Sequence, residues 1–175
     1  MTNSDEAPVH VVPYDALWPG RFEEERTLLL ETIGPWLTGP IEHIGSTAIP
    51  GLAAKPVVDI MAGVESLEAS FPAVALLERH GYCYFPYRPD VMHWFCKPSP
   101  AFRTHHLHLV PLQSRLWVER IAFRDCLRTH PDVAREYADL KWRLAEQHRF
   151  DREAYTDAKG PFVQRILQEA LGPGR

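Results

Sequence analysis

The chain has 175 residues, of which 45% are hydrophobic and 24% charged, and this composition is typical of one ordinary globular domain. Its formal net charge of −4 argues against the clustered basic surface of a nucleic-acid-binding protein. No apolar run reaches the length of a membrane-spanning helix, and the N-terminus has no signal-peptide pattern, so we expect a cytoplasmic protein without a membrane partner.

The first 112 residues alternate strand patterns with helix patterns. Apolar residues at every second position predict strands, spacings of three and four predict helices, and Pro and Gly mark the boundaries. In chain order these patterns predict a strand at 9–12, a helix from Trp18-Pro19 to Gly34-Pro35, strands at 40–45 and 56–62, a helix at 67–80, and strands at 82–87, 91–97 and 105–110.

After Pro111 the patterns are helical. They predict helices over 114–128, from Thr129 through Leu144, over 151–159 and over 162–170. We therefore predict an α/β (α+β) fold in one domain covering residues 1–175. A mixed β-sheet with flanking helices would occupy residues 9–112, and a helical C-terminal extension would occupy 114–171.

Two features between residues 42 and 64 point to phosphate chemistry. Gly45-Ser46 follows a predicted strand, where glycine permits a close backbone approach and serine offers a hydroxyl and an N–H. Asp59 interrupts the apolar run 57–61. A carboxylate buried in a strand is costly unless it is paired or binds a metal. Alternatively, Asp59 is a structural residue whose carboxylate is hydrogen-bonded to the backbone of the Gly-Ser turn.

A second group of polar residues lies on the strand predicted at 105–110. His106 and His108 are two positions apart, so their rings project from the same face. This spacing suits a shared metal ion, and nitrogen ligands favour Mn²⁺ or Zn²⁺ over Mg²⁺. The alternatives are a polar strand face without metal, or structural histidines. His43 and Glu42, just before Gly45, are further candidate ligands.

Long segments of this chain resemble the GrpB family, a group assigned to the nucleotidyltransferase superfamily. They are VVPYDALWPGRFEEE, IEHIGSTAIPGLAAKPVVDI, HLHLVP, FRDCLRTHPDVAREYADLK and YTDAKGPFVQRIL. The resemblance implies a nucleotidyltransferase-like sheet in which Gly45 and Ser46 bind the phosphates of a nucleoside triphosphate and Asp59 binds a divalent metal. In the superfamily pattern a second acid follows one position later, and here that position is Met61. Methionine does not bind Mg²⁺.

Three basic residues are candidates for the charge of the triphosphate. Lys55 precedes the Asp59 strand and has a predicted catalytic role, while Lys159 and Arg103 are predicted phosphate ligands. Each could instead be a solvated surface residue. Four tryptophans are interpreted as core aromatics rather than stacking platforms, namely Trp18, Trp94, Trp117 and Trp142.

Two functions remain open from the sequence. The first is an enzyme that transfers a nucleotidyl group from a nucleoside triphosphate to a small-molecule or other acceptor with the help of a divalent metal. The second is a degenerate nucleotidyltransferase scaffold that serves as a nucleotide-binding module or as a metal-dependent enzyme with other chemistry. The absence of the second acid at Met61 favours this second possibility. In some proteins of the resembling family this module is fused to dephospho-CoA kinase, which links it to nucleotide or coenzyme A metabolism.

Overall fold

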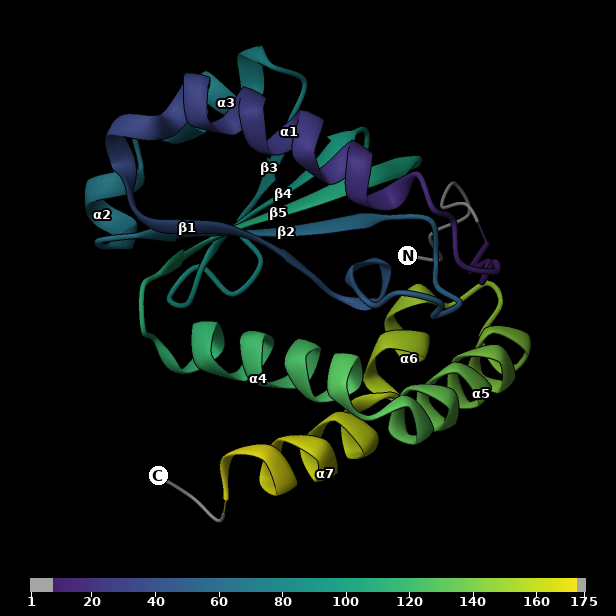
Figure 1. Cartoon of the computed structure of the whole chain (residues 1–175). Coiled ribbons are helices and arrows are strands. Elements are labelled where there is room, and N and C mark those ends of the chain that lie inside the picture. Colours follow the sequence, from purple (N-terminus) through teal and green to yellow (C-terminus); the bar gives the residue numbers. More distant parts are fainter. Residues whose placement is uncertain (1–7, 173–175) are drawn as a thin grey trace.

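The computed structural model describes residues 8–172, and it shows a five-stranded mixed sheet with helices on both faces (Figure 1). The strands are β1 (Leu37–Ile44), β2 (Val58–Val64), β3 (Cys83–Phe85), β4 (His93–Pro98) and β5 (Arg103–Pro111). The helices are α1 (Trp18–Ile33), α2 (Leu67–Ser70), α3 (Ala73–Arg79), α4 (Arg115–Thr129), α5 (Pro131–Gln147), α6 (Arg152–Asp157) and α7 (Gly160–Leu171), with 3-10 turns at Gly34–Trp36 and Ser46–Ala48. The predicted fold class is confirmed. No helix among residues 8–172 is long and apolar enough to cross a membrane.

The order of strands in the sheet is β1-β2-β5-β4-β3, and only β2 and β5 run parallel. A parallel pair needs a long crossover, and residues 65–102 supply it with α2, α3, β3 and β4. The register places Asp59 opposite His106 and Met61 opposite His108. Since side chains alternate between faces, all four project from the same face of the sheet.

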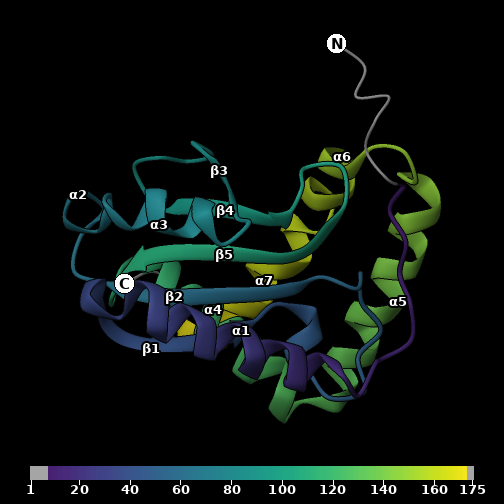
Figure 2. The same ribbon diagram turned by 90° about the horizontal axis from the view of Figure 1, so that it is seen from above.

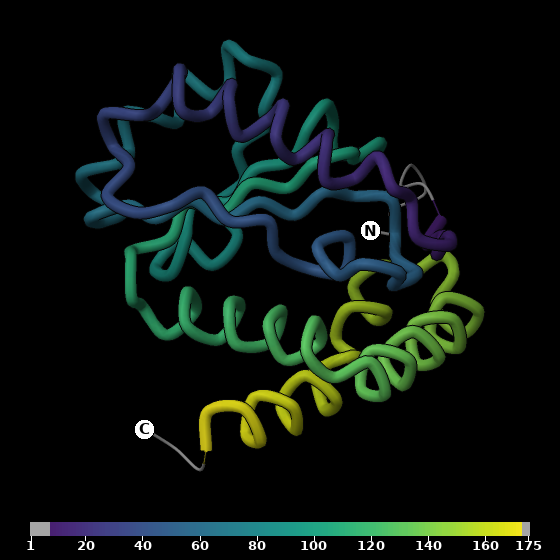
Figure 3. Tube along the Cα trace, in the orientation of Figure 1, coloured from purple at the N-terminus to yellow at the C-terminus, as the bar shows by residue number. Residues whose placement is uncertain are grey.

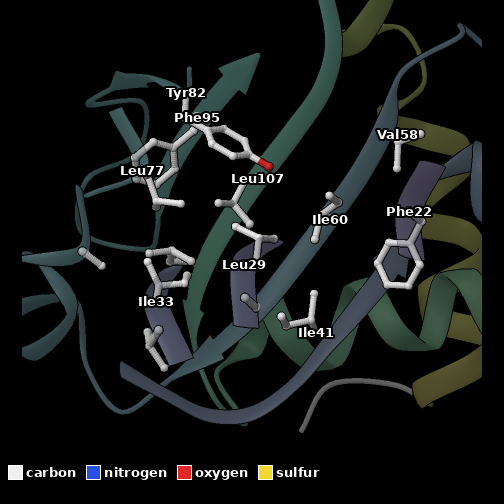
Figure 4. Packing of buried hydrophobic residues seen from close by; sticks show 14 of the residues in the cluster. Phe22, Leu29, Ile33, Ile41, Val58, Ile60, Leu77, Tyr82, Phe95 and Leu107 are labelled. Carbon is white, nitrogen blue, oxygen red and sulfur yellow. The ribbon is translucent and has the colours of Figure 1, made fainter. Parts of the chain in front are cut away.

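Helices α1 and α3 cover one face of the sheet, and α4 covers the other (Figures 1 and 2). The main core lies under α1, where Phe22, Leu29 and Ile33 meet Val58 and Ile60 of β2 (Figure 4). Leu29, Ile33 and Ile60 have no exposed surface. Each such side chain contributes about 1.5–3 kcal/mol through burial.

The opposite face of β2 carries Asp59 and Met61. Met61 is 0% exposed and belongs to an apolar cluster with Ile44 of β1 and Leu116 of α4. The position at which the superfamily pattern has its second acid is therefore a core position in this chain. Asp59, two residues earlier, lies where this apolar cluster ends and polar residues begin.

Two predicted elements are wrong in their boundaries or type. Residues 9–12 do not form a strand, because Pro13 has no N–H to extend a ladder, and only the bridge between Val12 and Ala54 forms. The N-terminal segment instead runs beside the end of α5, where Val9 N donates to Arg149 O at 2.7 Å (Figure 3). The predicted helix 67–80 is interrupted between α2 and α3 at Pro72, which lacks the N–H that an unbroken helix requires.

Candidate functional site

A carboxylate and two imidazole rings meet on the face of the sheet that α4 covers. The Oδ1 atom of Asp59 accepts a hydrogen bond from Nδ1 of His106 at 2.9 Å, and Nε2 of His108 lies 4.0 Å from the same oxygen. Burial by itself would raise the pKa of Asp59, but hydrogen bonds from the two histidines hold this pKa well below its ordinary value. Asp59 is therefore ionised at neutral pH, and His106 presents an Nδ1–H to it.

The two histidines differ in what their second ring nitrogen contacts. Nε2 of His106 is buried and has no hydrogen-bond partner among the described residues. Buried polar atoms are nearly always paired, so this atom marks strain or a place for a ligand. In His108, by contrast, Nδ1 faces the sulfur of Met92 at 3.3 Å, and burial lowers the pKa of the ring.

Gly45 lies directly against the carboxylate. Its backbone has φ +70° and ψ −172°, a conformation that is essentially restricted to glycine. A Cβ atom added to Gly45 would lie 2.5 Å from Oδ2 of Asp59. Gly45 is thus required for two reasons, its backbone conformation and the space that the Asp59 side chain occupies.

The turn that follows Gly45 is tied to the helical part of the chain. Ser46 begins the 3-10 turn and shares a hydrogen bond with the side chain of Tyr137 on α5, whose pKa burial raises to about 12. On α4, Nε of Arg128 donates to the carbonyl of Ala48 at 3.0 Å. The predicted phosphate loop is therefore held by α4 and α5 as well as by the sheet.

Cationic side chains converge on the same region. The ammonium groups of Lys55 and Lys159 lie 5.4 and 4.4 Å from the ring centre of Tyr155 on α6. The pKa of Lys159 is lowered to about 8, first by burial and then by the charge of Lys55, while the Asp59 carboxylate raises it and Arg120 lowers it further. The pKa of Lys159, at the α6–α7 junction, thus depends on charges from a loop, from α4 and from Asp59 on β2.

A further lysine, Lys141, is buried behind this group. Its ammonium donates to the carbonyl of Ala53 and lies 4.7 Å from the ring centre of Tyr137. Burial, and then the charge of Lys159, lower the pKa of Lys141 to about 7. Lys141 and Tyr137 were not among the site residues predicted from the sequence. The available signal was their i, i+4 spacing, which puts a lysine on the apolar face of α5.

Arg103 lies on the other side of the Asp59–His106 pair. Its guanidinium is 5.4 Å from the ring centre of Trp94, and that ring is 5.1 Å from the ring of His106. Lys55 and Lys159 therefore lie at the ring of Tyr155, whereas Arg103 lies at Trp94 beside the histidine. Of the four tryptophans predicted to be in the core, Trp18 is fully buried, but Trp142 is 43% exposed and Trp94 is half-buried.

The two remaining candidate ligands point elsewhere. His43 projects from the α1 face, stacks on Phe22 and bonds Thr47 Oγ1 through Nε2 at 3.0 Å. Burial lowers the pKa of His43 to about 4, so the ring is neutral. Glu42 accepts a hydrogen bond from Nη1 of Arg124 at 2.5 Å. Both residues have structural partners and neither contacts Asp59 through its side chain.

Within residues 8–172, no group of three or more His, Cys, Asp or Glu side chains is arranged to hold a metal ion. The oxygen of Asp59 that faces the histidines is hydrogen-bonded to His106, and His108 is 4.0 Å away. Met61 supplies no second carboxylate. These donors do not fit a metal centre built by the protein alone, and metal binding stays a prediction.

A hollow lies in another part of the molecule. It has a volume of about 410 Å³ between the loop after the Ser46 turn and helices α4 and α5, and its wall is mostly apolar with Arg128 and Arg135. Asp59 is not in its lining. The side chain of Asp59 is 29% exposed, so the polar residues around it can be reached from solvent outside this hollow.

Comparisons with known proteins identify the family and support the fold. The family model described as GrpB protein matches residues 8–169. The chain belongs to the GrpB family. A UPF0157 protein of Pseudomonas aeruginosa is 41% identical over 99% of this chain and 72% of its own length. The crystal structure of the conserved protein GrpB from Enterococcus faecalis matches with a TM-score of 0.84 and 34% identity, over 93% of this chain and 97% of that one.

A dephospho-CoA kinase of Mycolicibacterium paratuberculosis also resembles this GrpB chain. The identity is 28% over 94% of the chain, but only 46% of the kinase is covered. The GrpB-like part is therefore about half of that larger protein.

The support of the Gly45–Ser46 turn in this GrpB protein can be tested at Thr47. Thr47 Oγ1 bonds His43 and donates to the carbonyl of Val57 at 3.2 Å, so it joins β1, the turn and the start of β2. Replacing Thr47 by valine keeps the shape but leaves both partners unpaired. We expect the free energy of unfolding to fall by about 1–2 kcal/mol, measured by urea denaturation. No change would mean that these bonds do not stabilise the turn.

Proposed function

We propose that this GrpB protein binds a nucleoside triphosphate at the Gly45–Ser46 turn and transfers its nucleotidyl group to a small-molecule acceptor. One observation carries the proposal, namely that Lys55 and Lys159 meet at the ring of Tyr155, where the charges of Asp59 and Arg120 also act on Lys159. A lysine whose pKa is lowered by burial and by neighbouring cations, as that of Lys159 is, holds its charge at a cost in free energy. A polyanion bound among these cations would reduce that cost, and a triphosphate is such a ligand.

The individual residues suit distinct roles in this reaction. Backbone and hydroxyl groups of Gly45 and Ser46 would bind phosphate oxygens, and Lys55 and Lys159 would neutralise charge that develops on the leaving pyrophosphate. An acceptor oxygen would attack the α-phosphorus as the bond to pyrophosphate breaks. The unpaired Nε2 of His106, oriented through Nδ1 by Asp59, suits the group that takes the acceptor's proton.

The divalent ion would enter as part of the substrate complex. Nucleoside triphosphates bind such ions through their phosphate oxygens, and Asp59 is the carboxylate on the site face that could add a ligand. We propose that nearby imidazoles shift the preference of this joint site towards Mn²⁺ or Zn²⁺.

The second candidate function is a nucleotide-binding module without transfer. The burial of Met61 favours it, because the position of the second acid is occupied by a core side chain. The similarity to part of a dephospho-CoA kinase suits either function, since both involve a nucleotide. Release of pyrophosphate in the presence of acceptor candidates separates the two functions.

The cationic cluster predicts how affinity depends on pH. Triphosphate binds the protonated form of Lys159 more tightly, and in the free protein the pKa of this lysine is about 8. Affinity for ATP should therefore be highest below pH 8 and fall as pH rises through that value, by up to about tenfold per pH unit. Calorimetric titrations between pH 7 and 9, with Mg²⁺, Mn²⁺ or Zn²⁺, measure this effect and the metal preference.

Lys159→Met keeps much of the side chain's length over Tyr155 and removes its charge. In this variant the pH dependence should flatten and ATP should bind roughly tenfold more weakly. The exposed Arg143 on α5 provides a control for net charge, because Arg143→Ala removes a cation outside the cluster. Equal losses in the two variants would show that only the overall charge matters, and the proposed site would be rejected.

A further inference from the structure

Trp94 lies next to the residues of the proposed reaction, at the edge of the apolar cluster that contains Met61. It stands opposite His108 in the β4–β5 register and projects from the same face as Asp59 and His106. Its ring centre is 5.1 Å from that of His106. Trp94 remains half-buried rather than enclosed. Part of a large aromatic surface therefore remains accessible beside the Asp59–His106 pair.

The surroundings of Trp94 are those of a ring-binding surface. The guanidinium of Arg103 lies 5.4 Å from its ring centre, and the rings of Phe85 and Tyr87 lie at 5.8 and 6.3 Å. Tyr87 is 59% exposed. Aromatic side chains and arginine are the groups on which bases stack in proteins that bind nucleotides with little sequence preference.

The distance from the phosphate turn also suits this surface. Gly45 follows β1, and Trp94 is on β4, three strands away in the order β1-β2-β5-β4. Neighbouring strands are about 4.8 Å apart, so the two ends of the site are on the order of 14 Å apart. This is the scale of an extended nucleoside triphosphate measured from its last phosphate to its base.

We propose that Trp94, together with Arg103, is the surface on which the base of the bound nucleotide stacks. This inference rests on the proposed function, since it places the base of the same ligand whose phosphates lie at Gly45–Ser46. Stacking is tolerant of base identity, because every base has a π-face. The structure thus assigns affinity for the nucleoside part of the ligand to Trp94 and affinity for its phosphates to the lysines.

Paired titrations with ATP and with tripolyphosphate, which has no base, test the assignment. Trp94→Ala should weaken ATP binding roughly 5- to 100-fold and leave tripolyphosphate binding unchanged. Trp94→Phe keeps an aromatic face and should retain most of the affinity for ATP. Trp142→Ala, on the exposed side of α5, is the control for loss of a tryptophan and should change neither ligand. If Trp94→Ala does not fold, Trp94→Leu replaces it, with the same two ligands.

The outcomes separate this inference from the proposed function. If the wild type binds neither ATP nor tripolyphosphate, the proposed function fails, and the stacking assignment fails with it. If both ligands bind but the Trp94 variants keep the wild-type ratio of the two affinities, the base does not stack on Trp94 while the phosphate site stands. A loss confined to ATP supports the assignment.

Discussion

Replacing Gly45 by alanine is expected to weaken nucleoside triphosphate binding by at least tenfold and to lower the free energy of unfolding by about 1–3 kcal/mol. The first reason is the backbone, since φ +70° with ψ −172° is strained for any residue with a Cβ. The second is the Cβ itself, which would meet Oδ2 of Asp59 at 2.5 Å. The carboxylate would have to move away from the turn, and this movement disturbs its hydrogen bond to His106.

Gly51→Ala is the matched control for this experiment. Gly51 also has a positive φ, +77°, but a Cβ there would meet nothing within 4 Å. Both variants therefore carry backbone strain, and only the Gly45 variant disturbs Asp59. Calorimetry with ATP and urea denaturation of both proteins measure the two effects. If the two variants bind ATP equally well, the contact between Gly45 and Asp59 has no role in the site.

Much of the sheet could be predicted because its strands are short apolar or alternating runs bounded by turn residues. The patterns at 56–62 and 105–110 placed Asp59, His106 and His108 on strands, and the structure has these strands side by side and parallel. Alternation also determines which residues share a face, so the three polar side chains were expected to lie together. The direct hydrogen bond from His106 to Asp59 was not predicted, since the sequence left open whether these residues share a metal ion or have structural roles.

The site residues that the helices contribute were harder to predict from the sequence. Lys159 was predicted from its segment, but Tyr137, Lys141 and Arg120 come from α4 and α5, whose placement over the sheet depends on tertiary packing. Periodicity shows which face of a helix is buried and not which strand it meets. The break at Pro72 was missed for a related reason, because the apolar spacing on both sides of it continues the same helical period.

Asp59→Asn is expected to lower the rate of nucleotidyl transfer by roughly 100-fold or more while leaving the affinity for tripolyphosphate unchanged or higher. Asparagine can still accept the hydrogen bond from Nδ1 of His106, so the fold should persist. What is lost is the negative charge, which serves the reaction but repels phosphate. Removing this charge should also lower the pKa of His108 and of Lys159, because Asp59 raises both in the wild type.

Three measurements on Asp59→Asn therefore have to agree: pyrophosphate release, tripolyphosphate affinity, and the titration of His108 followed by NMR. Asp139→Asn, an exposed change on α5, is the control for the loss of one carboxylate charge. If Asp59 is only a structural support, Asp59→Asn should lower stability and ligand affinity together. The rate of transfer would then fall only because less of the protein is folded. If Asp59 takes part in the reaction, the rate should fall while the affinity for tripolyphosphate is kept and the pKa of His108 is lowered. Only a charge that acts on the reacting groups changes the rate without changing the affinity.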